Sequence, residues 1–543
     1  MKYKGGFLMK KLLVLLLVAV LCAPSFAALP DKDIVILYTN DVHCGVEDFI
    51  GYAGVEFYKH EMQKLTPYVT LVDAGDWAQG ATMGMISQGR YIIEIMNAMN
   101  YDVAVPGNHE FDYGWGMFER LAANIKCGFI SCNLKDLRTG EPVFKPYKIF
   151  TYGDVKVAFV GACTPESFTK STPSYFMDET GKYIYSFEED ETGEKLVAAI
   201  QKAVDAARAE GADYVIVVGH LGEYEDVREI WSVPFIAPRT RGIDAFIDGH
   251  SHEITPALHL KNADGKDVVV TQTGTKLRNI GKMTIKTDGT LTTELISDAG
   301  GRDEAINDLV ANIKGRYEDT LRQKLSVTSF DLRAMNDDSK WLIRNAENGL
   351  CNLATDAMLY SSERTKTGRA DVALYNAGGL RANIKAGTIT FNDALSVMPF
   401  NNTVCIVEVS GQSLLDELEH GARLMPERNG GLLHVAGMTY TIDSTIPTPV
   451  KVDDKNIWIS IEGERRVKDA KINGEPVDPE KLYKVVSISY VLMALGDGHR
   501  FNGARLIEPD YATASDEFAG YINTFDVLPE RYAQGEGRIT FIK

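Results

Sequence analysis

Short apolar runs, each ending in a polar turn, recur along the first half of the chain. Five of these runs are nearly continuous in apolar residues, which is typical of strands buried on both faces of a sheet. Each run leads directly into a turn that carries Asp, Asn or His. The runs cover residues 34–38, 68–72, 103–105, 214–218 and 245–247.

Helical periodicity appears between some of these runs and after them. From Leu196 to Ala207 the apolar residues recur every three or four positions, and Gly211 is placed to end that helix. Strands that alternate with helices predict an α/β fold. A further helix is predicted over residues 303–325. Its apolar stripe consists of Ile306, Leu309, Val310, Ile313, Tyr317 and Leu321.

We interpret this later helix as a connector between two domains, because a polar stretch at 336–340 follows it and α/β patterning then resumes. The predicted division is a leader at 1–27, a first domain at 30–300, a connecting helix and linker at 301–340, and a smaller α/β domain at 341–543. A mature chain of this length fits a small number of domains of ordinary size.

The N-terminus has the pattern of an export signal. Lys10 and Lys11 precede a wholly apolar run at 12–20, and the small-x-small sequence at 25–27 suits a cleavage site. The run is too short for a membrane span, and no later segment is long and apolar enough for one. Cys22 is not expected to be a lipoprotein site, because the bulky Leu21 precedes it. We therefore expect a periplasmic or secreted mature protein.

Composition narrows the classes of partner. The chain has 57 Lys plus Arg against 75 Asp plus Glu, a formal net charge of −18, so binding to a nucleic acid polymer is not expected. Small phosphorylated ligands remain compatible with this charge, because a bound metal ion inverts the local field. No CxxC pair occurs, so a zinc knuckle or thioredoxin-type site is not indicated. The sequence sets no oligomeric state.

The polar turns after the five runs carry the candidate chemistry. Ligands of open α/β sheets bind outside the carboxyl ends of the strands, so these side chains are expected to meet at one sheet edge. Carboxylates, imidazoles and an amide oxygen suit two divalent ions, with Zn, Mn, Fe or Co as candidates, and one Asp can bridge a pair. Five of the ten histidines fall in these turns. The gathered set is Asp41, His43, Asp76, Asn108, His109, His220, His250 and His252.

These turns carry a family resemblance. The segments TNDVH at 39–43, GD at 75–76, GNHE at 107–110, GH at 219–220 and GHSH at 249–252 resemble the five ordered blocks of the calcineurin-like metallophosphoesterases. The mature chain as a whole is similar to secreted bacterial 5′-nucleotidases with a separate C-terminal domain. The resemblance implies a four-layer αββα sandwich, followed by a connecting helix and a smaller α/β nucleotide-binding domain.

The same resemblance implies roles for the gathered residues. Asp41, His43, Asp76 and His252 would hold a first metal ion. Asp76, Asn108, His220 and His250 would hold a second, with Asp76 bridging. His109 would be the catalytic histidine, kept cationic by Asp112. Cys44 departs from the family pattern, which has Gly at that position.

The second domain carries candidate substrate residues. A predicted strand at 373–375 runs into Asn376, Gly378 and Gly379, where backbone can approach a ligand closely, and Arg381 can fork onto an anion. The resemblance implies that Arg344 and Arg381 hold phosphate, that Phe400 stacks on the base, that Asn376 and Asn402 contact the base region, and that Asp497 contacts the ribose. The second stacking position falls on Val491 or, with one inserted residue, on Tyr490, which we prefer.

The predicted function is an exported dimetal phosphohydrolase that releases phosphate from nucleoside 5′-monophosphates. Nucleotide sugars and nucleoside di- and triphosphates are further candidate substrates. One alternative keeps the scaffold and changes the substrate, as a 2′,3′-cyclic-nucleotide phosphodiesterase with 3′-nucleotidase activity or a thiosulfohydrolase-like enzyme. Another is a non-catalytic nucleotide-binding surface protein, which would lack metal ligands. The sequence has neither a GxSxG elbow nor a P-loop.

Overall fold

The structure, a computed structural model, describes residues 28–178, 182–223, 227–338, 340–453 and 456–542. The predicted leader at 1–27, with Cys22, lies outside the described residues. None of the helices in these ranges is both long enough and apolar enough to cross a membrane.

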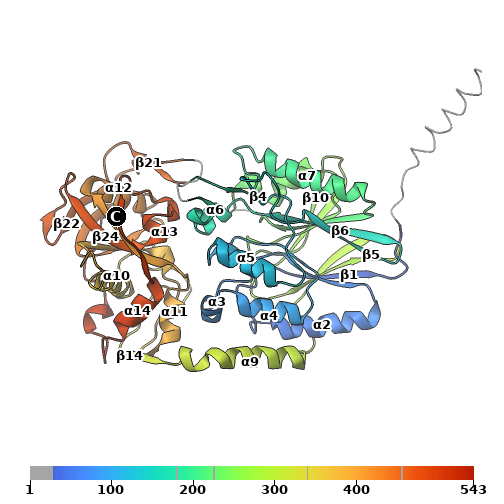
Figure 1. Cartoon of the computed structure of the whole chain (residues 1–543), viewed down its shortest axis with the longest axis horizontal. Coiled ribbons are helices and arrows are strands. Elements are labelled where there is room, and N and C mark those ends of the chain that lie inside the picture. The colour runs from blue at the N-terminus through green and yellow to red at the C-terminus, as the bar shows by residue number, and fades with distance from the viewer. Residues whose placement is uncertain (1–27, 179–181, 224–226, 339, 454–455, 543) are drawn as a thin grey trace, which may run out of the picture.

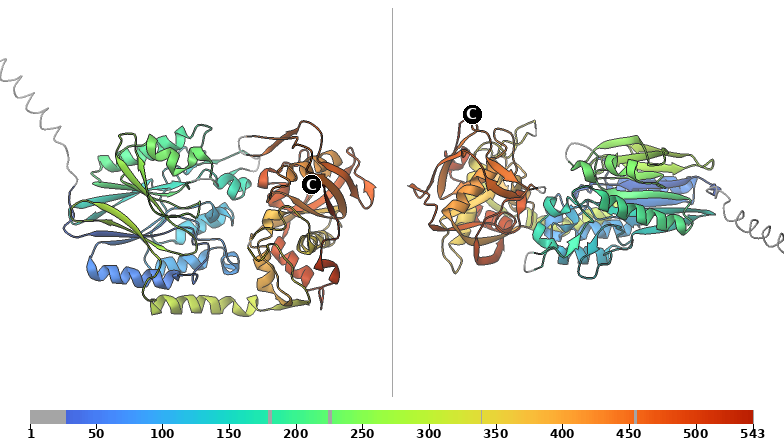
Figure 2. Two further views of the ribbon diagram at one scale, coloured as in Figure 1. Left: turned by 180° about the vertical axis from the view of Figure 1, so that it is seen from behind. Right: turned by 90° about the horizontal axis from the view of Figure 1, so that it is seen from above.

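The N-terminal half contains two stacked sheets (Figures 1 and 2). The first has the order β13-β12-β1-β2-β3, in which β1 pairs with β2 in parallel and with β12 antiparallel. The second has the order β10-β11-β9-β8-β6-β5, with a parallel centre from β6 to β11. The bounds of the first sheet's strands are Leu291–Ile296, Ile280–Ile285, Ile34–Thr39, Val69–Asp73 and Val103–Ala104. Those of the second are Ile254–Lys261, Asp267–Thr273, Ala245–Ile247, Tyr214–His220, Val155–Cys163 and Tyr147–Tyr152.

Side chains of alternate residues fill the space between these sheets. On β1, Ile36 and Tyr38 face the second sheet, while Leu37 faces the helices; Ile216 and Val218 of β8 face back toward β1. This alternation is the period of two that a strand dictates, and burial on both faces explains the continuous apolar runs. The Tyr38 hydroxyl adds a 2.6 Å hydrogen bond to Thr271 across the interface.

Helices cover both outer faces, which completes the αββα sandwich that the family resemblance implied (Figure 2). Helices α2, α4 and α5 lie on the first sheet, and α7 and α8 lie on the second. The predicted helix around 196–207 is α7, and Leu196, Ile200 and Val204 are buried as its spacing requires. The bounds are Gly51–Leu65, Arg90–Ala98, Trp115–Asn124, Glu194–Ala209 and Val233–Ile236.

The predicted connector is α9, Glu304–Leu321, which runs beneath the N-terminal half toward the C-terminal half (Figure 1). Asp303 caps its first turn by accepting a 3.0 Å hydrogen bond from the Ile306 backbone N–H. Its buried face packs against α2 and α4. The chain then enters β14, Lys324–Thr328, which pairs with β16, Gly387–Thr390, of the C-terminal half.

The C-terminal half is a second α/β unit with its own core. A five-stranded sheet has the order β18-β15-β24-β17-β25, and a four-stranded sheet has the order β23-β22-β19-β26. Helices α10, Gly349–Ser362, and α14, Ala514–Ile522, pack beside each other near the larger sheet. The larger sheet's strands are Leu433–Ala436, Val372–Asn376, Leu482–Ile488, Thr403–Ser410 and Arg505–Thr513. The smaller sheet's strands are Glu475–Pro476, Val467–Ile472, Met438–Asp443 and Ile539–Ile542.

One expectation needs correction. The five polar turns do not follow strands of a single sheet: β1, β2 and β3 belong to the first sheet, whereas β8 and β9 belong to the second. Because the two sheets stack, the carboxyl ends of all five strands still open at the same end of the sandwich. That end faces the C-terminal half (Figure 1).

Candidate metal centre and substrate cleft

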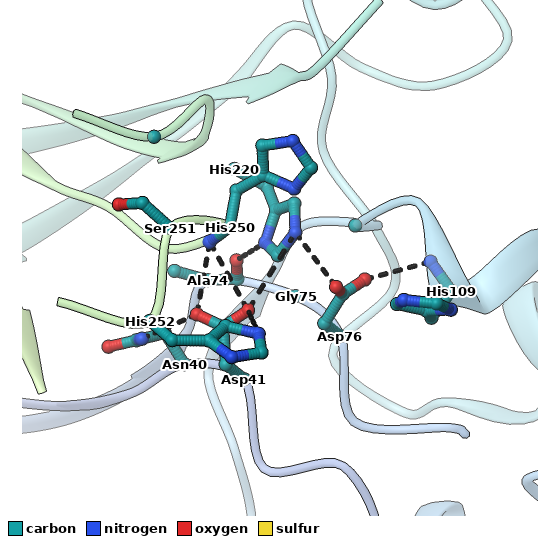
Figure 3. A network of polar contacts seen from close by, with 12 residues as sticks. Asn40, Asp41, Ala74, Gly75, Asp76, His109, His220, His250, Ser251 and His252 are labelled. Carbon is teal, nitrogen blue, oxygen red and sulfur yellow. Dashed lines mark hydrogen bonds and ion pairs between the residues drawn. The ribbon is translucent and has the colours of Figure 1, made fainter. Parts of the chain in front are cut away.

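The polar turns of both sheets converge on one cluster (Figure 3). Potential ligand atoms of Asp41, His43, Asp76 and His252 lie within 4.8 Å of one another, and so do those of Asp76, His220 and His250. Asp76 belongs to both groups. Its Oδ2 lies 3.8 Å from His43 Nε2 and 3.1 Å from His220 Nε2, so the shared carboxylate stands between the two groups.

The turns that carry these residues have unusual backbone conformations. Asp41, His43, Asp76, His250 and His252 all have positive φ, between 45° and 80°, a region that residues with a Cβ seldom adopt. Such conformations cost free energy and persist only where the surroundings enforce them, as at binding sites.

Two glycines allow the turns after β2 and β3 to approach each other. A Cβ on Gly107 would lie 2.2 Å from Asp76 Oδ1, and a Cβ on Gly75 would lie 2.6 Å from the Gly107 nitrogen. Any side chain at either position would displace the Asp76 carboxylate or the backbone that carries it.

Hydrogen bonds set the tautomers of three histidines in the cluster. His43 Nδ1 lies 3.0 Å from the Gln79 carbonyl, and His220 Nδ1 lies 2.7 Å from the Ala74 carbonyl, so each Nδ1 carries the proton and donates it. His250 reverses the pattern, because its Nε2 donates to the Glu166 carboxylate at 2.7 Å. In each ring the remaining nitrogen faces the cluster, which is the arrangement that metal-binding histidines use. Without a metal ion, burial opposes a charge on His220, but the charges of Asp76 and Asp41 overcome it and raise the pKa of His220 to about 10, so its Nε2 then carries a proton.

Buried polar atoms without hydrogen bonds mark the same place. Among the described residues, Asn108 Oδ1 is buried and has no hydrogen-bond partner, and His220 Nε2 is buried with the Asp76 carboxylate as an ion-pair contact at 3.1 Å. A buried amide oxygen left unpaired is costly, and an imidazole nitrogen beside two carboxylates favours a positive charge, so these atoms fit a site that binds a cation. The donor set of carboxylate, imidazole and amide oxygen also suits a divalent first-row metal.

The electrostatics keep the carboxylates ionised. Burial alone would raise the pKa of Asp76, but the charges of His220 and His109 outweigh it and hold that pKa well below its usual range. Burial likewise opposes ionisation of Asp41, and His220 and His252 overcome it to lower the pKa of Asp41. Burial lowers the pKa of His43 to about 4, so its ring is neutral near pH 7.

His109 stands beside the cluster and differs from the other histidines. Its backbone N–H donates to Asp76 Oδ1 at 2.8 Å, and its ring Nδ1 donates to Asp112 Oδ2 at 2.6 Å. Although burial opposes it, the charges of Asp112 and Asp76 raise the pKa of His109 to about 9. The ring is therefore cationic near pH 7, and its Nε2–H is available to the cleft.

Glu110, which sequence reasoning did not select, holds two of the turns together. Its buried carboxylate accepts hydrogen bonds from the backbone N–H groups of Asp76, Trp77, Ala78 and Gly107, at 2.6–3.0 Å. Both oxygens accept twice, which favours the ionised carboxylate, while burial and the charge of Asp76 oppose ionisation and raise the pKa of Glu110 to about 7. Its place as the last residue of the GNHE segment was the available signal.

Glu166 and Asp248 were also missed. Glu166 contacts His250, as described above, from the loop after β6. Asp248 accepts 2.9 Å hydrogen bonds from the backbone N–H groups of Leu221 and Gly222, which fixes the turn that follows His220. The position of Asp248 directly before the GHSH segment was an available signal. Glu166 had none, because it acts on a turn far from it along the chain.

Cys44 does not contribute to the cluster. Its thiol points toward the Ala78 carbonyl, 3.2 Å away, and burial raises the pKa of the thiol to about 12. It belongs to neither group of potential ligands. A thiol with a high pKa is a poor metal ligand, so the departure from the family pattern leaves the cluster unchanged.

A cleft of about 840 Å³ joins the cluster to the C-terminal half. From the N-terminal half it is lined by His43, His109, Asp112 and His252 among others. All nine residues predicted to bind substrate line the opposite wall. The cleft therefore has candidate metal ligands on one side and candidate substrate-binding residues on the other. They are Arg344, Asn376, Gly378, Gly379, Arg381, Phe400, Asn402, Tyr490 and Asp497.

The structure separates the two candidates for the second aromatic position. Tyr490, in α13, Ser489–Leu492, lines the cleft, whereas Val491 is fully buried in the core. The Tyr490 hydroxyl accepts a 3.1 Å hydrogen bond from the Asp497 backbone N–H. Asp497 Oδ2 in turn accepts from Asn376 Nδ2 at 2.7 Å, while Asn376 Oδ1 is buried without a partner among the described residues. These contacts hold Tyr490, Asp497 and Asn376 as one polar and aromatic surface.

Comparisons with known proteins agree with this geometry. The family model described as calcineurin-like phosphoesterase matches residues 34–253, and the model described as 5′-nucleotidase, C-terminal domain, matches residues 326–503. A 5′-nucleotidase of Bos taurus is 26% identical over 94% of this chain and 91% of its own length. A snake venom 5′-nucleotidase of Naja atra is 26% identical over 86% of this chain and 91% of its own.

Solved structures share the fold. The 5′-nucleotidase precursor from Thermus thermophilus has a TM-score of 0.67 and 24% identity, and the match covers 94% of this chain and 99% of that one. The sulfate thiohydrolase SoxB of Thermus thermophilus has a TM-score of 0.60 and 18% identity, with 95% and 98% covered. Proteins with this two-part architecture therefore carry more than one named activity. The fold alone does not identify the substrate, so a substrate has to be inferred from the residues that line the cleft.

Proposed function

Since this chain belongs to the 5′-nucleotidase family of calcineurin-like phosphoesterases, we propose that it releases phosphate from nucleoside 5′-monophosphates. The observation that supports this most is that one cleft contains both a cluster fit for metal and a wall of arginine, aromatic and amide side chains. Such a cleft brings a phosphate ester to the cluster while holding a base and a sugar on the far side.

We assign one ion to Asp41, His43, Asp76 and His252, and a second to Asp76, Asn108, His220 and His250. When bound, a pair of divalent ions lowers the pKa of water to near neutrality and neutralises charge on the phosphate. The candidates remain Zn, Mn, Fe and Co. Asp76 would serve both positions, and Glu110 and Glu166 would keep the turns and His250 in place.

The chain's own residues supply binding and charge. Arg344 and Arg381 attract the phosphate dianion and orient it by forked hydrogen bonds. His109 presents its Nε2–H to the phosphate and stabilises the negative charge that develops on its oxygens. Asp112 keeps that proton in place by holding Nδ1.

The C-terminal wall selects the rest of the substrate. Phe400 and Tyr490 would stack on the two faces of a base, and base–aromatic stacking contributes roughly 1–3 kcal/mol per base. The unpaired Asn376 Oδ1 would accept a hydrogen bond from the base or sugar. Asn402 would contact the base region, and Asp497 would accept from ribose hydroxyls. Gly378 and Gly379 would allow the backbone to approach.

We further propose that residues 30–300 form the hydrolytic domain, 301–340 the connection, and 341–543 the substrate-binding domain. Export is part of the proposal, since the predicted leader suits a periplasmic or secreted enzyme and one relative is a venom protein. Nucleotide sugars and nucleoside di- and triphosphates are secondary candidate substrates, since the cleft holds more than one cationic side chain.

A substrate panel tests this proposal against its alternatives. Purified protein with added Mn²⁺, Zn²⁺ or Co²⁺ should release phosphate from AMP faster than from 3′-AMP or 2′,3′-cyclic AMP. It should release no sulfate from thiosulfate esters. Preference for the cyclic substrate would favour the phosphodiesterase alternative. No turnover of any substrate by metal-loaded protein would favour a nucleotide-binding protein without catalysis.

A further inference from the structure

Trp341 faces the substrate cleft, and sequence reasoning did not select it. The Arg344 guanidinium carbon lies 4.4 Å from the centroid of the indole, and the Arg381 guanidinium carbon lies 5.3 Å from it. Both distances are within the range of a cation–π interaction. One aromatic ring thus contacts both arginines of the proposed phosphate site.

The two arginines otherwise have little to hold them together. Among the described residues neither forms an ion pair with a carboxylate, and Arg344 Nε is buried without a hydrogen-bond partner. Arg381 makes a long, 3.5 Å hydrogen bond to the Gly378 carbonyl, and its guanidinium carbon also lies 5.6 Å from the centroid of the Phe400 ring, which does not contact Arg344 in the same way. Partial burial, and next the charge of Arg381, lower the pKa of Arg344 to about 10. Both side chains are therefore cationic at neutral pH and repel each other.

We propose that Trp341 is a positioning residue that holds Arg344 and Arg381 together as one site for a phosphate dianion. The indole stabilises both charges through its π face and does not occupy their N–H groups, which stay available for the anion. A carboxylate in the same place would neutralise the site and compete with phosphate. This inference rests on the proposed function, because it assumes that the anion is the phosphate of the substrate.

The backbone around Trp341 is fixed. Trp341 pairs with Met335 in an antiparallel bridge, and the Leu342 N–H donates to the Ala334 carbonyl at 2.9 Å, so that residues 334–336 and 340–342 lie antiparallel as the two arms of a hairpin. Asn383 holds the hairpin by accepting hydrogen bonds from the Ala334 and Met335 N–H groups at 2.7 and 2.9 Å. The Trp341 carbonyl accepts from Arg428 Nε at 3.0 Å. The ring is therefore presented from a rigid element, as a positioning role requires.

Paired substitutions at Trp341 distinguish a cation–π effect of the indole ring from an effect of its apolar bulk. Trp341→Phe keeps an aromatic face, whereas Trp341→Leu keeps apolar bulk without one; Trp341→Met is a second non-aromatic variant should the Leu protein not fold. The direct readout is the affinity of metal-loaded protein for inorganic phosphate, measured by calorimetry, with the KM for AMP alongside. Trp115→Leu is the control, since Trp115 stacks on Tyr185 outside the cleft.

We expect the Leu and Met variants to bind phosphate roughly tenfold more weakly and to raise the KM for AMP by a similar factor, with kcat changed less. The Phe variant should stay within about threefold of the unaltered protein, and Trp115→Leu should leave phosphate affinity unchanged. Equal losses in the Phe and Leu variants, or no loss in Leu, would overturn the inference. Failure of the unaltered protein to hydrolyse AMP would instead refute the proposed function, and the phosphate titration would still test Trp341.

Discussion

His109 donates from Nδ1 to Asp112 Oδ2 at 2.6 Å, which leaves Nε2 as the nitrogen that faces the cleft. The two residues lie three positions apart, at either end of one short 3-10 turn that starts at His109. The pair therefore acts as one unit, in which the carboxylate orients the ring and keeps it charged.

Replacing His109 should separate catalysis from metal binding. His109→Ala should lower kcat for AMP by roughly 10²–10⁴-fold, because it removes a charged donor aimed at the phosphate. Asp112→Asn should cause a smaller loss, since the ring remains but is less strongly held and less basic. Metal content measured by mass spectrometry should stay as in the unaltered protein. Loss of metal from His109→Ala would show that the histidine acts as a ligand instead.

Glu110→Gln tests the residue that clamps two turns. The amide would place an NH₂ group against backbone N–H donors, so at least one buried donor would lose its acceptor, at a cost of roughly 1–3 kcal/mol or more. We expect a lower urea midpoint and weaker metal binding. Glu480→Gln, at an exposed position in the C-terminal half, is the matched control and should change neither. Unchanged stability of Glu110→Gln would contradict the clamp.

The choice between Tyr490 and Val491 can be tested by kinetics. Tyr490→Leu should raise the KM for AMP about tenfold through lost stacking, and leave hydrolysis of p-nitrophenyl phosphate, which has no base, nearly unchanged. Val491→Ala should lower stability by about 1–3 kcal/mol through a core cavity, with little effect on KM. The opposite pattern would place Val491 against the base.

His434 should make the C-terminal half sensitive to acid. Its Nε2 donates to the Ile343 carbonyl at 2.9 Å, its Nδ1 is buried without a partner among the described residues, and burial lowers its pKa to about 4. The unfolded chain, with a His pKa near 6.5, then binds more protons than the folded chain between pH 4 and 6.5. Stability should rise with pH across this window and fall as the pH drops.

Urea unfolding at pH 7 and pH 5 measures this effect. The free energy of unfolding should decrease from pH 7 to pH 5 in both proteins. The decrease should be roughly 2 kcal/mol smaller in His434→Gln than in the unaltered protein. The His259→Gln variant carries its change at an exposed site on β10 and should keep the original dependence. Equal pH dependence of all three proteins would show that His434 does not titrate as its burial indicates.

The strands and the candidate metal ligands were predictable because their signals are local. A continuous apolar run such as 214–218 indicates burial on both faces, and the Asp, Asn and His residues follow such runs within a few positions. The resemblance to the five family segments then assigned these residues to two metal positions. The same runs do not say which strands pair, so the division of the five strands between two sheets emerged only from contacts between distant residues.

The supporting residues were less predictable. Glu166 contacts His250, which lies 84 positions further along the chain. Trp341 contacts Arg381, and no hydrophobic periodicity in the sequence predicts that the two side chains lie close together. Their side chains are ordinary in sequence, and their roles depend on where tertiary packing places them. The sequence could have indicated Glu110, since it belongs to the GNHE segment, which was already selected for Asn108 and His109.

Metal titration of the stripped protein tests the central claim most directly. Protein treated with EDTA should hydrolyse no AMP, and stepwise addition of Mn²⁺ or Zn²⁺ should restore the rate until two ions per chain are bound, with no further gain. Full activity of the stripped protein, or saturation at a single ion, would contradict a site built from two ligand groups that share Asp76.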